Sequence, residues 1–370
     1  MRLSSFLILG GFHMPLCVAA VVNRRASASA DDFSHKVTVL SFLAMVSVVY
    51  IHHNAIDTTE PAYWNVVVQT FLTRALTDWA VPFFFIMSGF WVARSRYVSS
   101  EGATPFLMKK VRTLLVPYVL WAVLGAVISM PVIVFNNYVN HMPLLSRTCL
   151  GQEGVWENLD FLLGLTRNGP GGNLALWYVR TLLVFFLAVP VWRFLFRWSR
   201  MLPLLIGLPL VLVAPAAWIP GTGLKVGSFG WLLCGMGMST WLFENRRLPF
   251  WGAVLCGLAW ISLSLAKAFG IEAWPQLIPV AAIACLWSIS DWTRFYRGWM
   301  KPTFWVYCLH GALAAYTLAG PLFLFGKSGV SLLLIMLTMP WVNIGTCLLL
   351  AELVRRQMPK LYVALTGGRA

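Results

Sequence analysis

Ten long apolar runs dominate the sequence and decide what the chain can fold into. A helix needs roughly 20 mostly apolar residues to cross the hydrocarbon core of a bilayer. Charged residues make up only 11% of the chain, whereas soluble domains carry about a quarter. The sequence therefore predicts an all-α, polytopic bundle of about ten transmembrane helices. The runs cover about residues 37–54, 68–93, 113–135, 174–193, 202–219, 226–243, 249–266, 276–291, 302–325 and 329–354.

Lysines and arginines predict how this bundle is oriented. If the segment that contains Lys36 is cytoplasmic and the helices alternate, most basic residues fall on the cytoplasmic side. The other side then holds only Arg74, Arg147, Arg167, Lys225, Lys267 and Lys327. Cytoplasmic loops carry the excess of basic residues in membrane proteins. We therefore expect an inner-membrane protein with both flanks of the membrane core in the cytoplasm. The same rule explains the net charge of +15, so nucleic acid is not expected as a partner.

Residues 1–36 precede the ten runs and form a separate segment. They contain an apolar stretch at 4–22, and Ala28-Ser29-Ala30 looks like a signal-peptidase site. Cleavage at this point would invert every later helix and contradict the distribution of basic residues. We expect an extra apolar segment or a misplaced start, then a membrane domain over 37–357 and a short cytoplasmic tail over 358–370.

The seven cysteines do not suggest a bonded framework. Only Cys149 lies in a polar loop, and the chain has no C-x-x-C pair, in which two residues stand between the cysteines. This spacing predicts neither a disulfide framework nor a metal site.

Histidines inside apolar runs are the first candidates for chemistry. His52 and His53 end the first run and point about 100° apart on a helix, so at most one faces a given cavity. We expect His52 to face the bundle and His53 to face lipid or the interface. Ionisable residues are costly in a membrane and often functional there. A neutral histidine is a suitable general base near pH 7, but an interfacial pair is an equally good interpretation. His310, within the run at 302–325, is more simply interpreted as a hydrogen-bonded packing residue.

Basic residues at the helix ends are the second set of candidates. Lys109 and Arg112 are three residues apart and share a helix face. Such a cluster can anchor the helix, or it can bind a polyanion, because guanidinium groups suit phosphate oxygens. Arg180 lies a short way into the fourth run, where it could reach the interface or line a polar cavity. Ser88-Gly89 predicts close helix packing.

Five motifs together resemble the acyltransferase-3 family of integral membrane O-acyltransferases. Members have about ten helices and acylate, usually acetylate, cell-envelope glycans and other small or lipid-linked acceptors. The similarity extends over roughly residues 37–355, and His52 matches the family's essential histidine. The motifs, in family order, are VVYIHHN (48–54), VPFFFIMSGF (81–90), KKVRTLLVPYVLW (109–121), LWYVRTL (176–182) and FWVYCLHGAL (304–313).

One position departs from the family pattern. The family has an arginine or lysine eleven residues before the histidine, and this chain has Ser41 there. If another cation substitutes for it, Lys36 is the nearest along the chain, and Arg94 and Arg96 are alternatives at the end of the second run.

The resemblance implies a reaction and a site. His52 would take the proton of an acceptor hydroxyl, and Arg180, facing the same cavity, would stabilise the oxyanion or orient the acceptor. Acyl-CoA, most simply acetyl-CoA, would be the co-substrate, with no permanently bound cofactor. The expected partners are membrane lipid, acyl-CoA and a glycan or lipid-linked sugar. The expected donor-binding residues are Lys109, Lys110, Arg112, Arg94 and Arg96, and further site candidates are His53, Ser88, Trp177, Tyr178 and His310.

Two other functions remain open at this stage. Intramembrane histidine and arginine would also suit a proton-coupled transporter, although no inverted repeat relates the two halves of the sequence. The substitution at Ser41 leaves room for an inactive relative that acts as an interaction protein.

Overall fold

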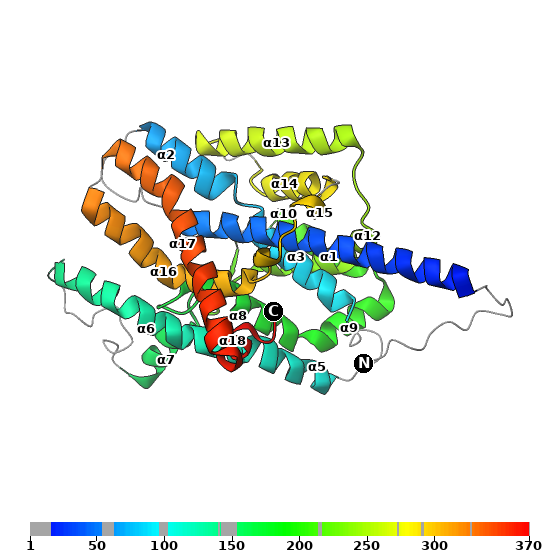
Figure 1. The fold of residues 1–370 in the computed structure, drawn as a ribbon, viewed down its shortest axis with the longest axis horizontal. Coiled ribbons are helices and arrows are strands. Elements are labelled where there is room, and N and C mark those ends of the chain that lie inside the picture. The colour runs from blue at the N-terminus through cyan, green and yellow to red at the C-terminus, as the bar shows by residue number, and fades with distance from the viewer. Residues whose placement is uncertain are drawn as a thin grey trace.

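The fold is a bundle of helices with one short hairpin (Figure 1). The computed structural model describes residues 16–53, 63–95, 103–139, 141, 154–213, 217–271, 274–289, 292–325 and 328–369. The α-helices are α1 (Leu16–His52), α2 (Tyr63–Gln69), α3 (Ala80–Ala93), α5 (Ala103–Lys110), α6 (Val116–Val139), α7 (Val155–Leu163), α8 (Trp177–Leu187), α9 (Val189–Trp198), α10 (Leu202–Val213), α11 (Val226–Gly237), α12 (Ser239–Phe243), α13 (Phe250–Ala268), α14 (Leu277–Ser288), α15 (Trp292–Phe295), α16 (Thr303–Phe325), α17 (Gly329–Gln357) and α18 (Pro359–Thr366).

Short π and 3₁₀ segments extend or link these helices. The π segments η1 (Thr70–Ala75) and η2 (Val111–Leu115) continue α2 and α5, while η4 (Leu174–Leu176) and η5 (Gly298–Met300) are 3₁₀ turns. The hairpin pairs β1 (Trp218–Ile219) with β2 (Leu224–Lys225) in antiparallel register, Trp218 opposite Lys225.

Six helical segments are long and apolar enough to cross a membrane. They span Asp31–His52, Tyr63–Ala93, Thr104–Val139, Phe250–Ala268, Thr303–Phe325 and Gly329–Gln357. Four shorter apolar helices cover Leu174–Leu187, Leu202–Val213, Val226–Gly237 and Leu277–Ser288. Each of the ten predicted runs overlaps one of these segments, so the helical membrane bundle is confirmed. A helix of 12 residues reaches only about 18 Å, less than the roughly 30 Å of the hydrocarbon core. The count of ten spans stays a prediction.

Helix α13 shows how the surface of the bundle suits lipid. Its apolar side chains Trp251, Leu255 and Leu258 are all more than half exposed, and α13 lies at the edge of the bundle beside α14 (Figure 1). A continuous apolar face of this kind is unfavourable in water and marks contact with a membrane or partner. We interpret this face as one covered by lipid.

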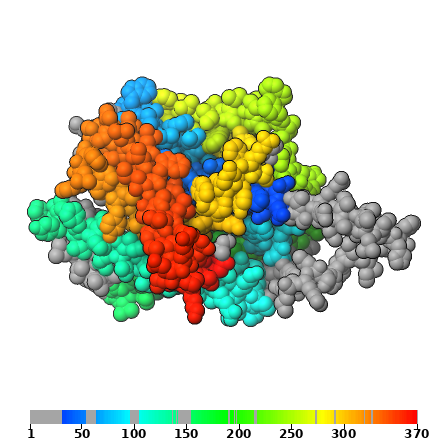
Figure 2. Space-filling view, in the orientation of Figure 1, coloured from blue at the N-terminus to red at the C-terminus, as the bar shows by residue number. Residues whose placement is uncertain are grey.

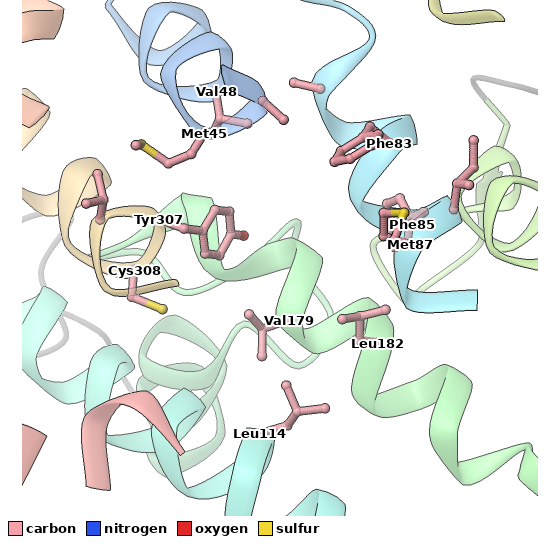
Figure 3. Packing of buried hydrophobic residues seen from close by; sticks show 14 of the residues in the cluster. Met45, Val48, Phe83, Phe85, Met87, Leu114, Val179, Leu182, Tyr307 and Cys308 are labelled. Carbon is pink, nitrogen blue, oxygen red and sulfur yellow. The ribbon is translucent and has the colours of Figure 1, made fainter. Parts of the chain in front are cut away.

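The centre of the bundle is built around α1, which contacts α3, α16 and α17. Buried side chains of α1, α3, α8 and α16 meet there, among them Met45, Phe85, Val179 and Tyr307 (Figure 3). These helices come from distant parts of the chain, so the core joins its two halves.

Helices α3 and α11 pack closely because both present glycine at their contact. A Cβ atom on Gly89 would lie 2.0 Å from the carbonyl oxygen of Leu232, and one on Gly235 would lie 2.0 Å from that of Ile86. Neither position can therefore hold a larger residue without moving a backbone. The close packing predicted for Ser88-Gly89 is confirmed.

Both ends of the membrane domain are helical. Helix α1 begins at Leu16 and runs without a break past residue 36 to His52, while residues 1–15 lie outside the described part of the chain. The predicted division at residue 36 stays a prediction. Within the predicted tail, α18 packs against α6, α16 and α17, and Figure 2 shows this C-terminal segment in red, between the teal and orange parts of the surface.

Candidate active site

Two cavities lie within the bundle on either side of one aromatic wall. The larger, of about 540 Å³, is called here the His52 cavity and is lined by His52, Asp78, Trp177, Lys225, Trp231 and Lys267, among others. The smaller, of about 320 Å³, is called the Lys110 cavity and is lined by Ser88, Lys110, Leu182, Phe304 and Arg369, among others. Both volumes lie within the range of about 300–1,000 Å³ typical of small-molecule sites.

The aromatic wall consists of Phe84, Tyr178 and Tyr307, which line both cavities. The Tyr178 hydroxyl donates to the carbonyl oxygen of Phe84 (3.1 Å) and lies 2.8 Å from the hydroxyl of Ser88. Tyr307 packs edge-on against Tyr178, with ring centroids 5.6 Å apart, and donates its hydroxyl to the carbonyl of Ala175. In Figure 3, Tyr307 projects from α16 into the space between α1 and α8. The cavities are therefore separated only by side chains.

His52 is placed as the sequence predicts, facing a cavity within the bundle. Its ring lies 5.2 Å from that of His310, centroid to centroid. His310 is fully buried, and its Nδ1 lies 3.1 Å from the carbonyl oxygen of Val306. Because that carbonyl can only accept, Nδ1 carries the hydrogen and Nε2 of the neutral ring is an acceptor. Nε2 has no hydrogen-bond partner among the described residues. Two histidines from α1 and α16 thus meet beside the His52 cavity.

His53 does not lie at a lipid surface or interface, and that prediction is wrong. The residue is fully buried between α1 and α16. Its Nδ1 donates to the carbonyl of Val49 (2.8 Å), and its Nε2 lies 2.9 Å from the hydroxyl of Thr317. Thr317 also accepts from Asn343 Nδ2 (3.2 Å). This fixed network satisfies both ring nitrogens, so the geometry gives His53 a packing role.

The basic cluster near residue 110 is divided between the cavity and the surface. Lys110 lines the Lys110 cavity, with its ammonium 4.2 Å from the ring centroid of Phe186. Lys109 and Arg112 are exposed and line neither cavity. The predicted face shared by Lys109 and Arg112 therefore points outward, whereas Lys110 points toward the cavity.

Two of the three cations considered as substitutes at the Ser41 position, Lys36 and Arg94, line neither cavity. The ammonium of Lys36 donates to Asn245 Oδ1 (2.8 Å) and to the carbonyl of Trp287, and it sits over the Trp287 ring. The guanidinium of Arg94 lies 3.5 Å from the ring centroid of Phe243. Arg96 lies outside the described residues. Both Lys36 and Arg94 are engaged by groups outside the His52 cavity.

The sequence suggested that Arg180 faces the His52 cavity. In the structure it does not line this cavity and instead holds two loops together. Its guanidinium donates to the carbonyl oxygens of Gly164 and Arg167 in the loop after α7. It also donates to those of Thr222 (2.9 Å) and Gly223 (2.6 Å) at the hairpin tip. These turns leave backbone carbonyls without partners in regular structure, and buried carbonyls need donors. Arg180 is 7% exposed and lines neither cavity. The structure thus gives it the role of joining two loops.

Trp177 contributes to the His52 cavity, while Ser88 contributes to the Lys110 cavity and Tyr178 to both. Sequence reasoning missed other polar members of the larger cavity. Lys267 pairs with Asp78 across it (2.7 Å), and Lys225 lies over the rings of Trp177 and Trp218. A mixture of indole rings and charged or amide groups suits a polar ligand with apolar faces.

Fold and site define an integral membrane protein with two internal cavities and a histidine pair beside the larger one. A sequence model of the acyltransferase domain of the acyltransferase-3 family matches residues 35–351. The chain belongs to this family of membrane acyltransferases. Comparison with curated proteins and with solved structures found no match.

Proposed function

We propose that the protein transfers an acyl group, most simply acetyl, from acyl-CoA to a hydroxyl group of a cell-envelope glycan or lipid-linked sugar. The observation that supports this best is the pair of cavities that share the wall of Phe84, Tyr178 and Tyr307. One cavity holds cations suited to a phosphate-bearing donor. The other holds a histidine, indole rings and polar groups suited to a sugar.

Membrane orientation supports a direction for the reaction. In the orientation that the basic residues favour, the Lys110 cavity lies toward the cytoplasm, where acyl-CoA is found. The His52 cavity then lies toward the outer side, where an envelope sugar would be found. The acyl group crosses at the aromatic wall, so the donor itself need not pass through the membrane.

The chemistry assigned to His52 is general-base catalysis. Its imidazole takes the proton of the acceptor hydroxyl as the oxygen attacks the thioester carbonyl carbon. The tetrahedral intermediate then collapses, the carbon–sulfur bond breaks, and the imidazolium returns the proton to the CoA sulfur. Assistance of this kind is worth roughly 10²–10⁴ in rate. His310, with an acceptor nitrogen beside His52, is placed to orient the ring or to share its proton.

Acyl transfer by the purified protein tests this proposal. The protein would be incubated in detergent with radiolabelled acetyl-CoA and a panel of sugar acceptors, and labelled ester and free CoA would be measured. We expect ester formation by the wild type and none by His52→Ala, at equal amounts of folded protein. Acetyl-CoA that remains intact with every acceptor would favour an inactive relative instead.

A further inference from the structure

Helix α18 lies beyond the matched residues 35–351, yet it is firmly attached to the bundle. The indole of Trp121 in α6 donates to the carbonyl of Leu365 (2.9 Å). The ring of Tyr362 stacks on that of Trp305 in α16, with centroids 5.3 Å apart. Tyr362 and Leu365 are both buried. The C-terminal segment is therefore held in a defined place beside the Lys110 cavity.

A tight turn after α18 sets the position of the last described residue. Gly367 has a φ of 63°, and a Cβ atom there would lie 2.4 Å from the carbonyl oxygen of Thr113 in η2. Only glycine meets both conditions without strain. The amide of Gly368 closes the turn by donating to the carbonyl of Val363 (3.0 Å). The chain is thereby directed so that Arg369, although exposed to solvent, reaches the Lys110 cavity.

Arg369 lines the Lys110 cavity together with Lys110. Its guanidinium lies 4.3 Å from the ring centroid of Phe304. Arg369 is exposed to solvent, and a guanidinium carries its charge at neutral pH. No carboxylate is among the residues that line this cavity, and neither cation has an ion-pair partner in the described part of the chain. Two like charges in one cavity without a counter-ion favour binding of an anion.

We propose that Arg369, carried by α18 from outside the family domain, is a donor-binding residue that holds phosphate groups of acyl-CoA together with Lys110. The inference rests on the proposed function and names a residue for its donor site. A guanidinium can engage two phosphate oxygens at once, whereas a lysine ammonium acts as a point charge. Ser88 and Tyr178 further along the cavity leave an apolar and hydroxyl-lined path toward the aromatic wall for the thioester arm.

Binding of acetyl-CoA to the full-length protein in detergent tests this inference. We expect Arg369→Ala to raise the Kd for acetyl-CoA about tenfold or more, because hydrogen bonds to charged groups are worth about 1.5–3 kcal/mol. Arg369→Lys should lie between. Lys360→Ala is the matched control, because Lys360 is an exposed cation on α18 that does not line the Lys110 cavity, and the Kd of this variant should stay within about twofold of wild type.

A phosphate-free donor separates phosphate binding from a general change in shape. S-acetylpantetheine carries the thioester arm without the nucleotide phosphates, so Arg369→Ala should bind it as the wild type does. Gly367→Ala offers a second variant that keeps the charge but disturbs the turn, and it should also weaken acetyl-CoA binding.

The outcomes distinguish the inference from the function beneath it. If the wild type binds acetyl-CoA and Arg369→Ala binds it equally well, the inference alone is overturned. It is also overturned if Arg369→Ala loses only co-purified phosphatidylglycerol, because the phosphate is then that of a lipid. If the wild type does not bind acetyl-CoA, the proposed function fails and the inference with it.

Discussion

The rings of His52 and His310 lie 5.2 Å apart, centroid to centroid, although the two residues are 258 positions apart in the sequence. Nδ1 of His310 is occupied by the Val306 carbonyl, so its free nitrogen, Nε2, is an acceptor with no partner among the described residues. A buried acceptor without a donor is costly. The ring of His52 packs beside it, and we expect a His52 nitrogen that carries a proton to relieve this cost during the reaction.

This pairing predicts a non-additive mutant cycle. His52→Ala should lower the rate of acyl transfer by roughly 10²–10⁴, the usual worth of a general base. His310→Ala should lower it less, because it removes only the group that orients or shares the proton of His52. The double variant should be no slower than His52→Ala, since residues that act as a unit do not add. Rates would be normalised to folded protein. Independent, multiplying losses would separate the two histidines functionally.

His53 is predicted to matter for stability rather than for chemistry. His53→Ala leaves the Val49 carbonyl and the Thr317 hydroxyl without their buried partner. A loss of about 1–3 kcal/mol is expected for buried groups left unsatisfied, and thermal unfolding in detergent would measure it. The turnover of the protein that remains folded should stay close to wild type. A catalytic defect at full stability would contradict this assignment.

Lys110 and Lys109 provide a matched pair for the donor site. They are adjacent lysines, but only Lys110 lines the cavity, and Lys109 is exposed. Lys110→Ala should raise the KM for acetyl-CoA about tenfold, whereas Lys109→Ala should change it by less than about twofold. Both variants remove one basic residue from the same segment, so a change in membrane orientation would affect them alike. Accessibility of an introduced cysteine would check that orientation.

Sequence reasoning found the parts of the site that a helix pattern reveals. Apolar runs give the bundle, and the position of His52 at the end of a run indicates a cavity. The pattern could not tell Lys110 from Lys109. Adjacent residues on a helix point about 100° apart, and only the packing of α5 against other elements such as α8 decides which of them faces the bundle. Arg180 was assigned to the wrong place and Arg369 was missed, both for a different reason. Their surroundings are formed by loops and by α18, whose contacts join segments that are distant in sequence and follow no helical pattern.

Arg180 is therefore expected to act through the fold. Arg180→Ala removes the donor for carbonyls of two loops that are distant in sequence, and this should cost at least about 2 kcal/mol of stability. Arg180→Lys keeps the charge but offers fewer donors in a different shape, so it should restore only part of the loss. Thermal unfolding would show the effect. The KM values of the folded fraction should not change, and a kcat defect without loss of stability would return Arg180 to the reaction.

The same loop should make stability depend on pH through Asp160. Its carboxylate accepts from the Thr166 amide (2.6 Å), the Thr166 hydroxyl (3.0 Å) and Arg167 Nε (2.8 Å). Burial acts to raise the pKa of Asp160, but these hydrogen bonds outweigh it and hold the pKa below its usual range. The folded state thus favours the charged form. Its stabilisation is complete above the unfolded pKa of about 3.9 and is lost as the pH falls through the lower, folded value.

Asp160→Asn should therefore be less stable than the wild type at pH 7, by about 1–3 kcal/mol, and the gap should narrow as the pH falls below about 4. Thermal unfolding followed from pH 7 to pH 3 would measure both parts. Glu157→Gln is the control, because Glu157 is an exposed carboxyl on the same helix, α7, and its removal should leave the profile unchanged. A gap between Asp160→Asn and wild type that stays constant down to pH 3 would mean that the charge of Asp160 does not hold this loop.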